Sequence, residues 1–257
     1  MTEPKKYFFI SSLAKGLDVL ELLAEKGESS VSDVAKTLGH NRTGSHRLLA
    51  TLKELGYVEQ NLNNKYHLTF KMLELGMKLS NRLGIRTLAL PYMEQLSTAF
   101  GETINLGVRD GFNILHLEKI DSTEILRMDS PIGSTAPVYC SALGKAITAF
   151  MPGGLLASFL SEIKITPHGP NCVSSAKELE TELAKVKNQG FAMDDEELAS
   201  GLRCVAAPVF DHAGAVRYSI SVSGPAMRLT KERVQQIQKK LKNSCHELSK
   251  QLKQLNQ

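Results

Sequence analysis

The chain has 257 residues, a hydrophobic fraction of 42% and a formal net charge of +4, so we expect two folded domains and exclude a disordered chain. The four cysteines contain no CxxC pair, which argues against a disulfide framework or a zinc site. No apolar run has the length of a signal peptide or a membrane span, and we therefore expect a soluble, cytoplasmic protein without a membrane partner.

Charge is distributed unevenly along the chain. Residues 1–80 carry 11 basic and 9 acidic residues, residues 81–230 carry 13 and 16, and residues 231–257 carry 7 and 2. The segment from Val34 to Lys53 has no acidic residue, although six basic or histidine side chains fall in it. Because carboxylates repel phosphates, this acid-free segment indicates a surface that faces nucleic acid.

Three helices are predicted near the N-terminus, over residues 12–26, 31–38 and 42–56. Ser30 followed by Asp33 resembles a capping box, Gly39 ends the second helix, and Asn41 caps the third. Two helices joined by so short a turn are typical of a helix-turn-helix that enters the DNA major groove.

The third helix has two predicted faces. Ser45, Leu48, Leu52 and Leu55 are expected to pack inward, while Arg42, His46 and Lys53 share another face, with Thr43 and Arg47 beside it. Gly44 is unusual inside a helix, and we expect Gly44 and Ser45 to let the second helix approach closely.

A hairpin follows the third helix. Residues 57–60 and 65–68 are predicted strands, and the Asn-rich tip between them supplies turn chemistry. Asn63, Asn64 and Lys65 would lie where they reach the DNA backbone or the minor groove. Residues 8–69 are therefore predicted to form a winged helix-turn-helix DNA-binding domain.

A linker helix is predicted over residues 70–84. Its apolar stripe, which includes Phe70, Leu73 and Met77, has no obvious packing partner, so we expect this helix to join the domains and to dimerise. A further helix is predicted from Ile85 to Phe100, with Pro91 bending or restarting it.

The remaining chain, residues 85–257, is predicted to be an α+β effector domain built on an antiparallel sheet. Strands are expected over residues 103–109, 112–120, 124–129, 191–196, 203–210 and 215–223. Residues 131–137 are predicted to form a loop. Helices are expected over residues 141–150, near residue 155, and over residues 175–190 and 230–255.

A ligand pocket is predicted on this sheet. If Asp211 pairs with Gly214 across the turn, Cys204 lies opposite Ser221 and Leu202 opposite Ser223, so all four line one surface. Ser141 opens a helix whose free N–H groups would favour an anion, and residues 194–197 add acceptors. Hydroxyls, a thiol and amides around an apolar floor suit a small carboxylate or hydroxy acid.

Each of these features also has a purely structural interpretation. The serine row could be the solvent face of a strand, Cys204 a buried small residue, and the acidic run a solvated loop. Enzyme signatures are weak: Gly144-Lys145 lacks the spacing of a phosphate loop, and no HExxH or GxSxG motif occurs. We therefore predict no catalytic residue, metal or cofactor. The alternatives are a small-acid enzyme with Cys204 as nucleophile and a ligand-independent DNA-binding protein.

Several blocks of sequence, in the right order, resemble the IclR family of bacterial transcription regulators. The resemblance covers nearly the whole chain. It rests on residues 17–20, 47–58 and 65–68 in the N-terminal part, and on residues 141–146, 194–197, 201–211, 221–225 and 228 in the C-terminal part.

The resemblance implies a winged-helix domain, a linker helix and a GAF/profilin-like effector domain. It implies dimers, or dimers of dimers, on palindromic double-stranded operator DNA, and small organic acids as effectors. In the family the pocket uses the positions of Ala142, Leu143, Asp194, Leu202, Cys204, Ser221 and Ser223.

Residues 102–107, 119–122 and 126–128 look closest to the repressors of 2-keto-3-deoxygluconate and pectin breakdown, which favours a sugar acid or a keto acid. The sequence thus predicts a ligand-responsive repressor of a catabolic operon that reads DNA through Arg42, Thr43, His46 and Arg47.

Overall fold

A computed structural model describes residues 9–211 and 213–254 and divides the chain into two compact units between Gly84 and Ile85. Residue 8, His212 and Leu255, which belonged to predicted segments, lie outside the described residues. Each unit is described by itself.

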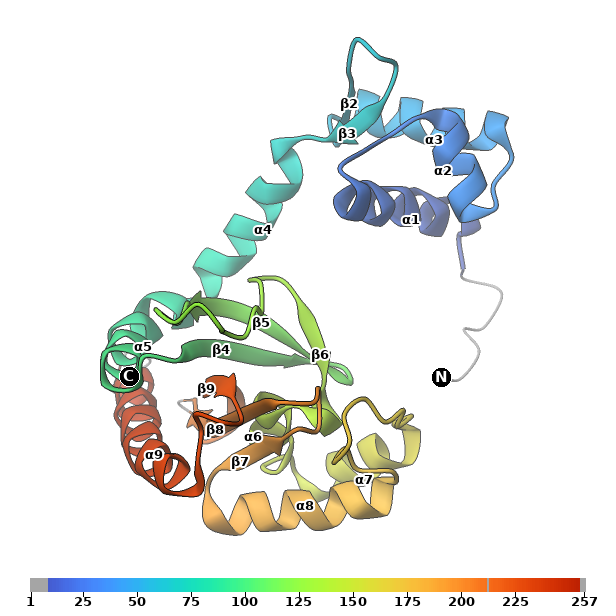
Figure 1. The fold of residues 1–257 in the computed structure, drawn as a ribbon. Helices are drawn as coiled ribbons and strands as arrows, with labels where there is room; N and C mark the ends of the chain where they lie inside the picture. The colour runs from blue at the N-terminus through green and yellow to red at the C-terminus, as the bar shows by residue number, and fades with distance from the viewer. Residues whose placement is uncertain (1–8, 212, 255–257) are drawn as a thin grey trace. The chain divides into compact units, whose positions relative to one another are not determined.

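The N-terminal unit is a bundle of helices with a small sheet (Figure 1). Its elements are α1 (Ser11–Lys26), β1 (Glu28–Ser29), α2 (Val31–Leu38), α3 (Arg42–Glu54), β2 (Val58–Gln60), β3 (Tyr66–Leu68) and α4 (Phe70–Leu83). Leucine and valine side chains of the first three helices, together with Val58 and Tyr66, form its core.

Local capping chemistry sets the ends of α2 and α3. The Ser30 hydroxyl accepts from the Asp33 amide while the Asp33 carboxylate accepts from the Ser30 amide, so the predicted capping box is confirmed. Gly39 ends α2 in the left-handed region, and the Asn41 side chain caps α3 by accepting from the Gly44 amide at 2.6 Å.

Two expectations for α3 were wrong. Leu55 is 53% exposed, and it is Leu49, together with Ser45 and Leu52, that is fully buried. Leu55 is exposed because it lines, with Leu48 and Leu52, an apolar groove that is open to solvent. Gly44 is needed for the cap rather than for α2, since a Cβ there would come within 2.9 Å of the Asn41 Oδ1.

The wing contains one strand more than predicted. β3 pairs with β2 on one side and with the two-residue β1 on the other, in the order β1-β3-β2. β1 is too short to show a period of two in the sequence, and only its pairing with Tyr66 and His67 identifies it as a strand.

The C-terminal unit is a six-stranded antiparallel sheet covered by helices, in the order β6-β5-β4-β9-β8-β7. The strands are β4 (Thr103–Asp110), β5 (Asn113–Ile120), β6 (Thr135–Pro137), β7 (Ala192–Asp195), β8 (Leu202–Phe210) and β9 (Val216–Pro225). The helices are α5 (Ile85–Phe100), the short η2 (Val138–Cys140), α6 (Ala142–Thr148), α7 (Gly153–Glu162), α8 (Ala176–Gln189) and α9 (Lys231–Gln254).

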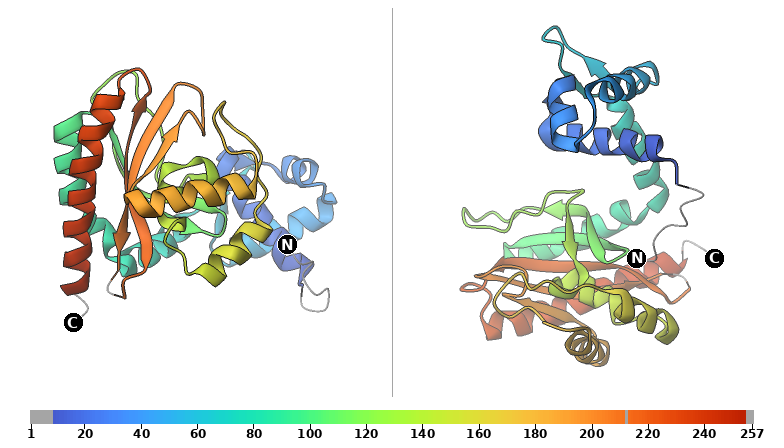
Figure 2. Two further views of the ribbon diagram at one scale, coloured as in Figure 1. Left: turned by 90° about the horizontal axis from the view of Figure 1, so that it is seen from below. Right: turned by 90° about the vertical axis from the view of Figure 1, so that its right-hand side faces the viewer.

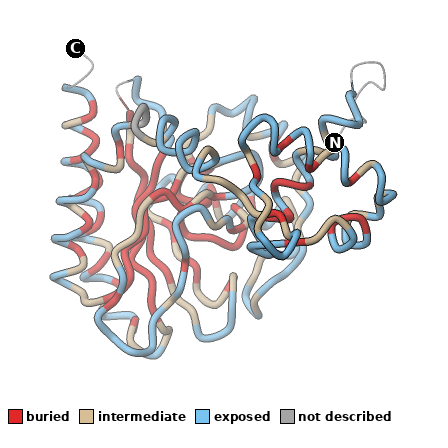
Figure 3. Tube along the Cα trace, turned by 90° about the horizontal axis from the view of Figure 1, so that it is seen from above, coloured by how far each residue is buried: buried red, intermediate tan, exposed pale blue. Residues whose placement is uncertain are grey.

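Helices cover both faces of this sheet. α5 and α9 pack on one face, and α6, with α8 behind it, packs on the other (Figures 1 and 2). The central strands are therefore buried along most of their length (Figure 3). This burial on both sides explains why Thr103 to Gly107 are all buried, although their sequence alternates between apolar and polar residues.

The strand predicted over residues 124–129 was wrong. These residues form an exposed loop without strand pairing, and Ile125 is 99% exposed. The edge strand is instead β6, which pairs with β5 inside the segment predicted as loop. Its three residues, Thr-Ala-Pro, are too few to show alternation, and Pro137 suits a strand edge.

The predicted register of β8 and β9 was shifted by two residues. The turn is one residue longer than assumed, since Asp211 N–H donates to the Ala215 carbonyl, and a bulge between Val209 and Phe210 adds another. Cys204 therefore pairs with Ser223 rather than Ser221, and Leu202 pairs with Pro225. A shift of two leaves every side chain on its predicted face.

Within the described residues, none of the helices is long and apolar enough to cross a membrane.

Candidate functional site

The exposed surface of α3 carries the side chains predicted to read DNA. Arg42, Thr43, His46 and Arg47 are all exposed. Their side chains have no hydrogen bond or ion pair with any residue that the structure describes. Three cationic or titratable groups are thus free to contact phosphates or base edges without first breaking an internal interaction.

The wing is held by Asn61 rather than by the predicted contact residues. The Asn61 Oδ1 accepts from the amides of Asn63 and Lys65, and its Nδ2 donates to Glu28. Asn63 and Asn64 are exposed, while the Lys65 ammonium lies 2.8 Å from the Glu28 carboxylate. A DNA phosphate would therefore compete with the Glu28 carboxylate for the Lys65 ammonium group.

An apolar groove runs between α1, α3 and α4 within the N-terminal unit. Leucine and methionine side chains line most of it: Leu13, Leu17, Leu20, Leu48, Leu52, Leu55, Met72 and Leu75. Several of these are more than 40% exposed, including Leu13, Leu17 and Leu75. Arg47 borders the same groove, at the margin of the basic surface of α3.

In the C-terminal unit a small cavity lies between α6 and the sheet. Six of the seven predicted effector residues line it: Ala142, Leu143, Asp194, Cys204, Ser221 and Ser223. Leu202 does not line it, because it lies two residues before Cys204, at the start of β8, beside Pro225. The cavity has room for about one water molecule.

The serine row is not a solvent face. Ser219, Ser221 and Ser223 are buried, and α6 covers them. The Ser219 hydroxyl donates to the Leu143 carbonyl at 3.0 Å, which ties β9 to the start of α6. Ser221 and Ser223 share a hydrogen bond of 3.2 Å.

The start of α6 faces this cavity. Ser141 caps the helix by accepting from the Gly144 amide. The amides of Ala142 and Leu143, in the first turn, have no acceptor within the helix. Together with the hydroxyls of β9, they form a set of donors suited to a carboxylate oxygen.

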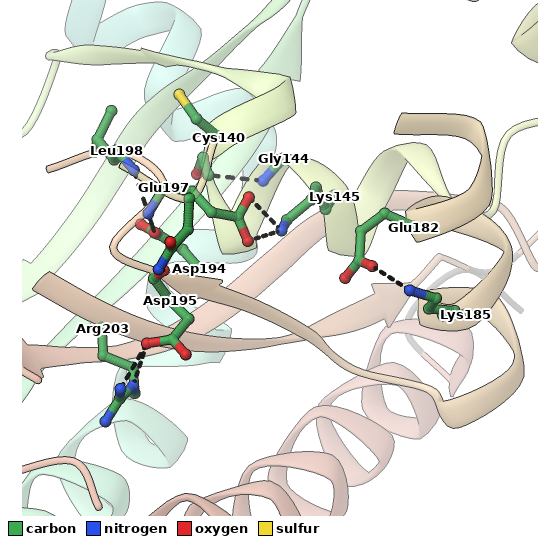
Figure 4. Close-up of polar contacts among 12 residues, drawn as sticks. Cys140, Gly144, Lys145, Glu182, Lys185, Asp194, Asp195, Glu197, Leu198 and Arg203 are labelled. Carbon is green, nitrogen blue, oxygen red and sulfur yellow. Dashed lines mark hydrogen bonds and ion pairs between the residues drawn. The ribbon is translucent and has the colours of Figure 1, made fainter. Parts of the chain in front are cut away.

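The acidic run is not a solvated loop either. Asp194 is buried, and its Oδ1 accepts from the amides of Glu197 and Leu198 at 2.8 and 3.2 Å (Figure 4). The carboxylate of Glu197 lies 2.5 and 2.6 Å from the Nζ of Lys145, which is completely buried in α6. Sequence reasoning missed Lys145, because its partner is 52 residues away.

Burial perturbs the protonation of these groups. It raises the pKa of Asp194 to about 6, and it raises the pKa of Glu197 to about 6 against the opposing effect of the Lys145 charge. Burial also raises the pKa of the Cys204 thiol well above its ordinary value, and the neighbouring Asp194 carboxylate adds to this rise. A thiol held protonated in this way is a poor nucleophile, which argues against the Cys204 enzyme.

Further residues line the cavity, and among them only Ser141 was connected to the pocket by the sequence. They are Asn105, His116, Met128, Ala136, Ser141 and Leu198. The Asn105 Oδ1 accepts from the Ser130 hydroxyl at 2.6 Å, and its Nδ2 donates to Ser223 at 3.4 Å. Asn105 gave no signal in the sequence, because polar and apolar residues alternate along its strand.

No cluster of three or more potential metal ligands occurs in the described part of the chain.

Comparison with known families matches both units. Residues 12–62 match the IclR helix-turn-helix domain, and residues 77–250 match the bacterial transcriptional regulator IclR C-terminal domain. The resemblance inferred from the sequence blocks is therefore confirmed, as is the fold class of a helix-turn-helix joined to an antiparallel α+β domain.

Similar proteins match over nearly their whole length. The HTH-type transcriptional regulator KdgR of Escherichia coli (strain K12) is 34% identical, covering 95% of this chain and 93% of KdgR. The DNA-binding transcriptional repressor YiaJ of the same organism is 33% identical, covering 94% of this chain and 87% of YiaJ.

Solved structures share the fold. The crystal structure of an IclR homologue from Microbacterium hydrocarbonoxydans, complexed with 4-hydroxybenzoate, has a TM-score of 0.82 with 22% identity. The match covers 94% of this chain and 98% of the homologue.

Proposed function

Because this chain belongs to the IclR family of bacterial transcriptional regulators, we propose that it is a repressor whose binding to DNA is controlled by a small organic acid. The family makes it a ligand-responsive, DNA-binding regulator. Repression is supported by the similarity to YiaJ, which is a repressor. The similarity to KdgR supports the sub-family resemblance seen in the sequence.

Residues 8–69 would bind DNA, residues 70–84 would form the helix that links the two domains, and residues 85–257 would bind the effector. α3 would enter the major groove with Arg42, Thr43, His46 and Arg47 nearest bases and phosphates. Asn63, Asn64 and Lys65 would contact the backbone or the minor groove. The exposure of the α3 side chains and their lack of partners among the described residues support this role.

The effector would bind in the cavity beside α6, which is the observation that carries this proposal. One carboxylate oxygen would accept from the amides of Ala142 and Leu143, and the other from the hydroxyls of Ser221 and Ser223. Since Asp194 and Cys204 are buried against the same cavity, the acid would contact them as well. Because the cavity has room for about one water molecule, it would have to open to admit the acid. The ligand would then favour the open conformation of the effector domain over the closed one.

The protein would act as a homodimer, or as a dimer of dimers. The exposed apolar groove between α1, α3 and α4 supports self-association, because a patch of this kind is costly to leave in water. A second copy would bring a second α3 to the other half of a palindromic site.

A two-part experiment tests this function. Binding sites are selected from genomic fragments with the full chain, and a panel of sugar acids, keto acids and aromatic acids is screened for thermal stabilisation. A true effector at about 100 times its Kd adds about 2.7 kcal/mol of stability. The same acid should release the selected DNA; if no acid both stabilises the protein and alters DNA binding, the sensing role is wrong.

A further inference from the structure

The imidazole of His116, on β5, is buried and has no hydrogen-bond partner among the described residues. It is 4% exposed, and within the described part of the chain neither its Nδ1 nor its Nε2 has a donor or acceptor in reach. A buried polar group that stays unpaired costs about 1–3 kcal/mol, and such groups are rare in folded proteins. Within the described residues, the protein therefore leaves the donor and the acceptor of the His116 imidazole unused.

The imidazole faces the effector cavity. His116 lies opposite Gly107 on β4, and a Cβ on Gly107 would come within 3.1 Å of the Leu143 side chain at the start of α6. That face of the sheet is therefore the face that α6 covers, and His116 lines the cavity there. The side chains of Ile114 and Leu143 occupy the space over Gly107, within 3.0 and 3.1 Å of where its Cβ would lie.

The other polar side chains near the imidazole already have partners. Asn105 uses its oxygen for Ser130 and its amide for Ser223. Ser141 accepts from the start of α6. Among the described residues that line the cavity, His116 is the polar side chain left without a partner.

The protonation of His116 limits what can satisfy it. Burial lowers the pKa of His116, and the nearby charge of Lys119 lowers it further, so the imidazole is neutral at neutral pH. A neutral imidazole has one donor and one acceptor. A hydroxyl group complements both, whereas a second carboxylate offers only acceptors and an alkyl or phenyl carbon offers neither.

We propose that His116 is a specificity residue of the effector site, and that the effector is a small monocarboxylic acid with a hydroxyl group on the chain beyond its carboxylate. The carboxylate of the effector accepts hydrogen bonds from the amides at the start of α6 and from the serine hydroxyls of β9. The hydroxyl group of the effector pairs with the His116 imidazole. This inference rests on the proposed function, since it assumes that the cavity binds the effector.

Three matched pairs of acids test the proposal on the full chain. Each pair has one chain length with and without hydroxyl groups: glycerate and propionate, threonate and butyrate, gluconate and hexanoate. Calorimetric affinities are measured for the wild type, His116→Phe and His116→Gln, with His246→Phe, an exposed histidine of α9, as the matched control.

In at least one pair the wild type should bind the hydroxylated acid at least tenfold more tightly than its partner. His116→Phe should remove this preference without weakening the unsubstituted acid. His116→Gln keeps a donor and an acceptor and should restore part of the preference. His246→Phe should behave as the wild type.

Other outcomes separate the two proposals. If the wild type binds acids without preferring a hydroxylated member, or if His116→Phe keeps the preference, the inference about His116 is wrong and the effector site stands. If no acid of the general panel or of the pairs binds the wild type, the proposed sensing function fails, and this inference fails with it.

Discussion

The two units place their candidate functional residues in opposite environments. On α3 the residues proposed to contact DNA are exposed and have no partner among the described residues, whereas around the cavity of the C-terminal unit the proposed effector residues are buried and hydrogen-bonded. In the first unit, the side chains of Arg42 and Arg47 on α3 make no hydrogen bond or ion pair within the described residues. In the second, Asp194, Ser221 and Ser223 belong to the packing of the sheet.

This difference predicts how mutations act. Replacing Arg42 or Arg47 on α3 should change DNA binding and leave stability unchanged, because the side chain has no hydrogen bond or ion pair with the described residues. Replacing a polar residue near the cavity should affect ligand response and stability together, because an unpaired buried partner remains. The following changes test this contrast.

The largest effect is expected from Lys145→Met. It leaves the buried Glu197 carboxylate without its partner, and breaking a buried pair in this way costs about 3–5 kcal/mol. Urea unfolding of the full chain measures the loss. Lys185→Ala, which breaks the surface pair with Glu182, is the matched control and should change little. A loss for Lys145→Met as small as that of the control would contradict the prediction.

The next largest effect is expected from Ser221→Ala combined with Ser223→Ala. Removing two hydroxyls that bind a charged group, each worth about 1.5–3 kcal/mol, should weaken the effector at least roughly a hundredfold and abolish the response, while DNA binding persists. Ser249→Ala, which removes a buried hydroxyl on α9 that accepts from Phe210, is the control. If DNA release by the effector survives in the double variant, the pocket is elsewhere.

Arg42→Ala should weaken DNA binding about tenfold or more, as expected for loss of a contact worth roughly 1–3 kcal/mol. The melting temperature should not change, because Arg42 has no hydrogen bond or ion pair within the described residues. Fluorescence anisotropy with a selected site measures the affinity. Lys239→Ala, on the exposed face of α9, removes the same charge and should bind DNA like the wild type. Unchanged affinity for Arg42→Ala would refute its assignment.

The smallest effect concerns pH. The pKa of Asp194 is raised from 3.8 to about 6 in the folded state, so the folded protein binds more protons than the unfolded chain between these values. The contribution of Asp194 to stability is therefore full below about pH 4 and is lost as the pH rises through 6. Glu197 has the same sign.

Asp194→Asn tests this linkage, because an amide oxygen can still accept from the Glu197 and Leu198 amides. The fall in stability between pH 4 and 6 should be shallower in the variant than in the wild type, as followed by urea unfolding across this range. Parallel pH profiles would show that Asp194 is not the titrating group.

Sequence patterns predicted the N-terminal unit well where the interactions are local. The capping box of Ser30 and Asp33 and the cap by Asn41 join residues three positions apart, so their chemistry can be read directly from the order of residues. The failures there involved tertiary contacts. β1 exists only because β3 pairs with it, and Leu55 is exposed because the groove that it lines is open to solvent.

For the effector site the sequence predicted six cavity residues, and the predicted face was correct despite a wrong register. The longer turn at Asp211 and the bulge at Phe210 each moved the pairing by one residue, and the two errors together preserved the side-chain alternation. The family resemblance, now confirmed, had named the same positions.

The sequence by itself determined the family, the fold class, the helix caps and the acid-free surface, because each depends on neighbouring residues or on recurring blocks of sequence. Only the tertiary structure decided that Lys145 pairs with Glu197 and that Asn105 joins Ser130 to Ser223. It also decided that His116 faces the cavity. One physical reason is that helices cover both faces of the sheet, so the alternation of apolar and polar residues along a strand does not distinguish a solvent face from a pocket. The other is that the residues joined by each of these contacts lie far apart in the chain.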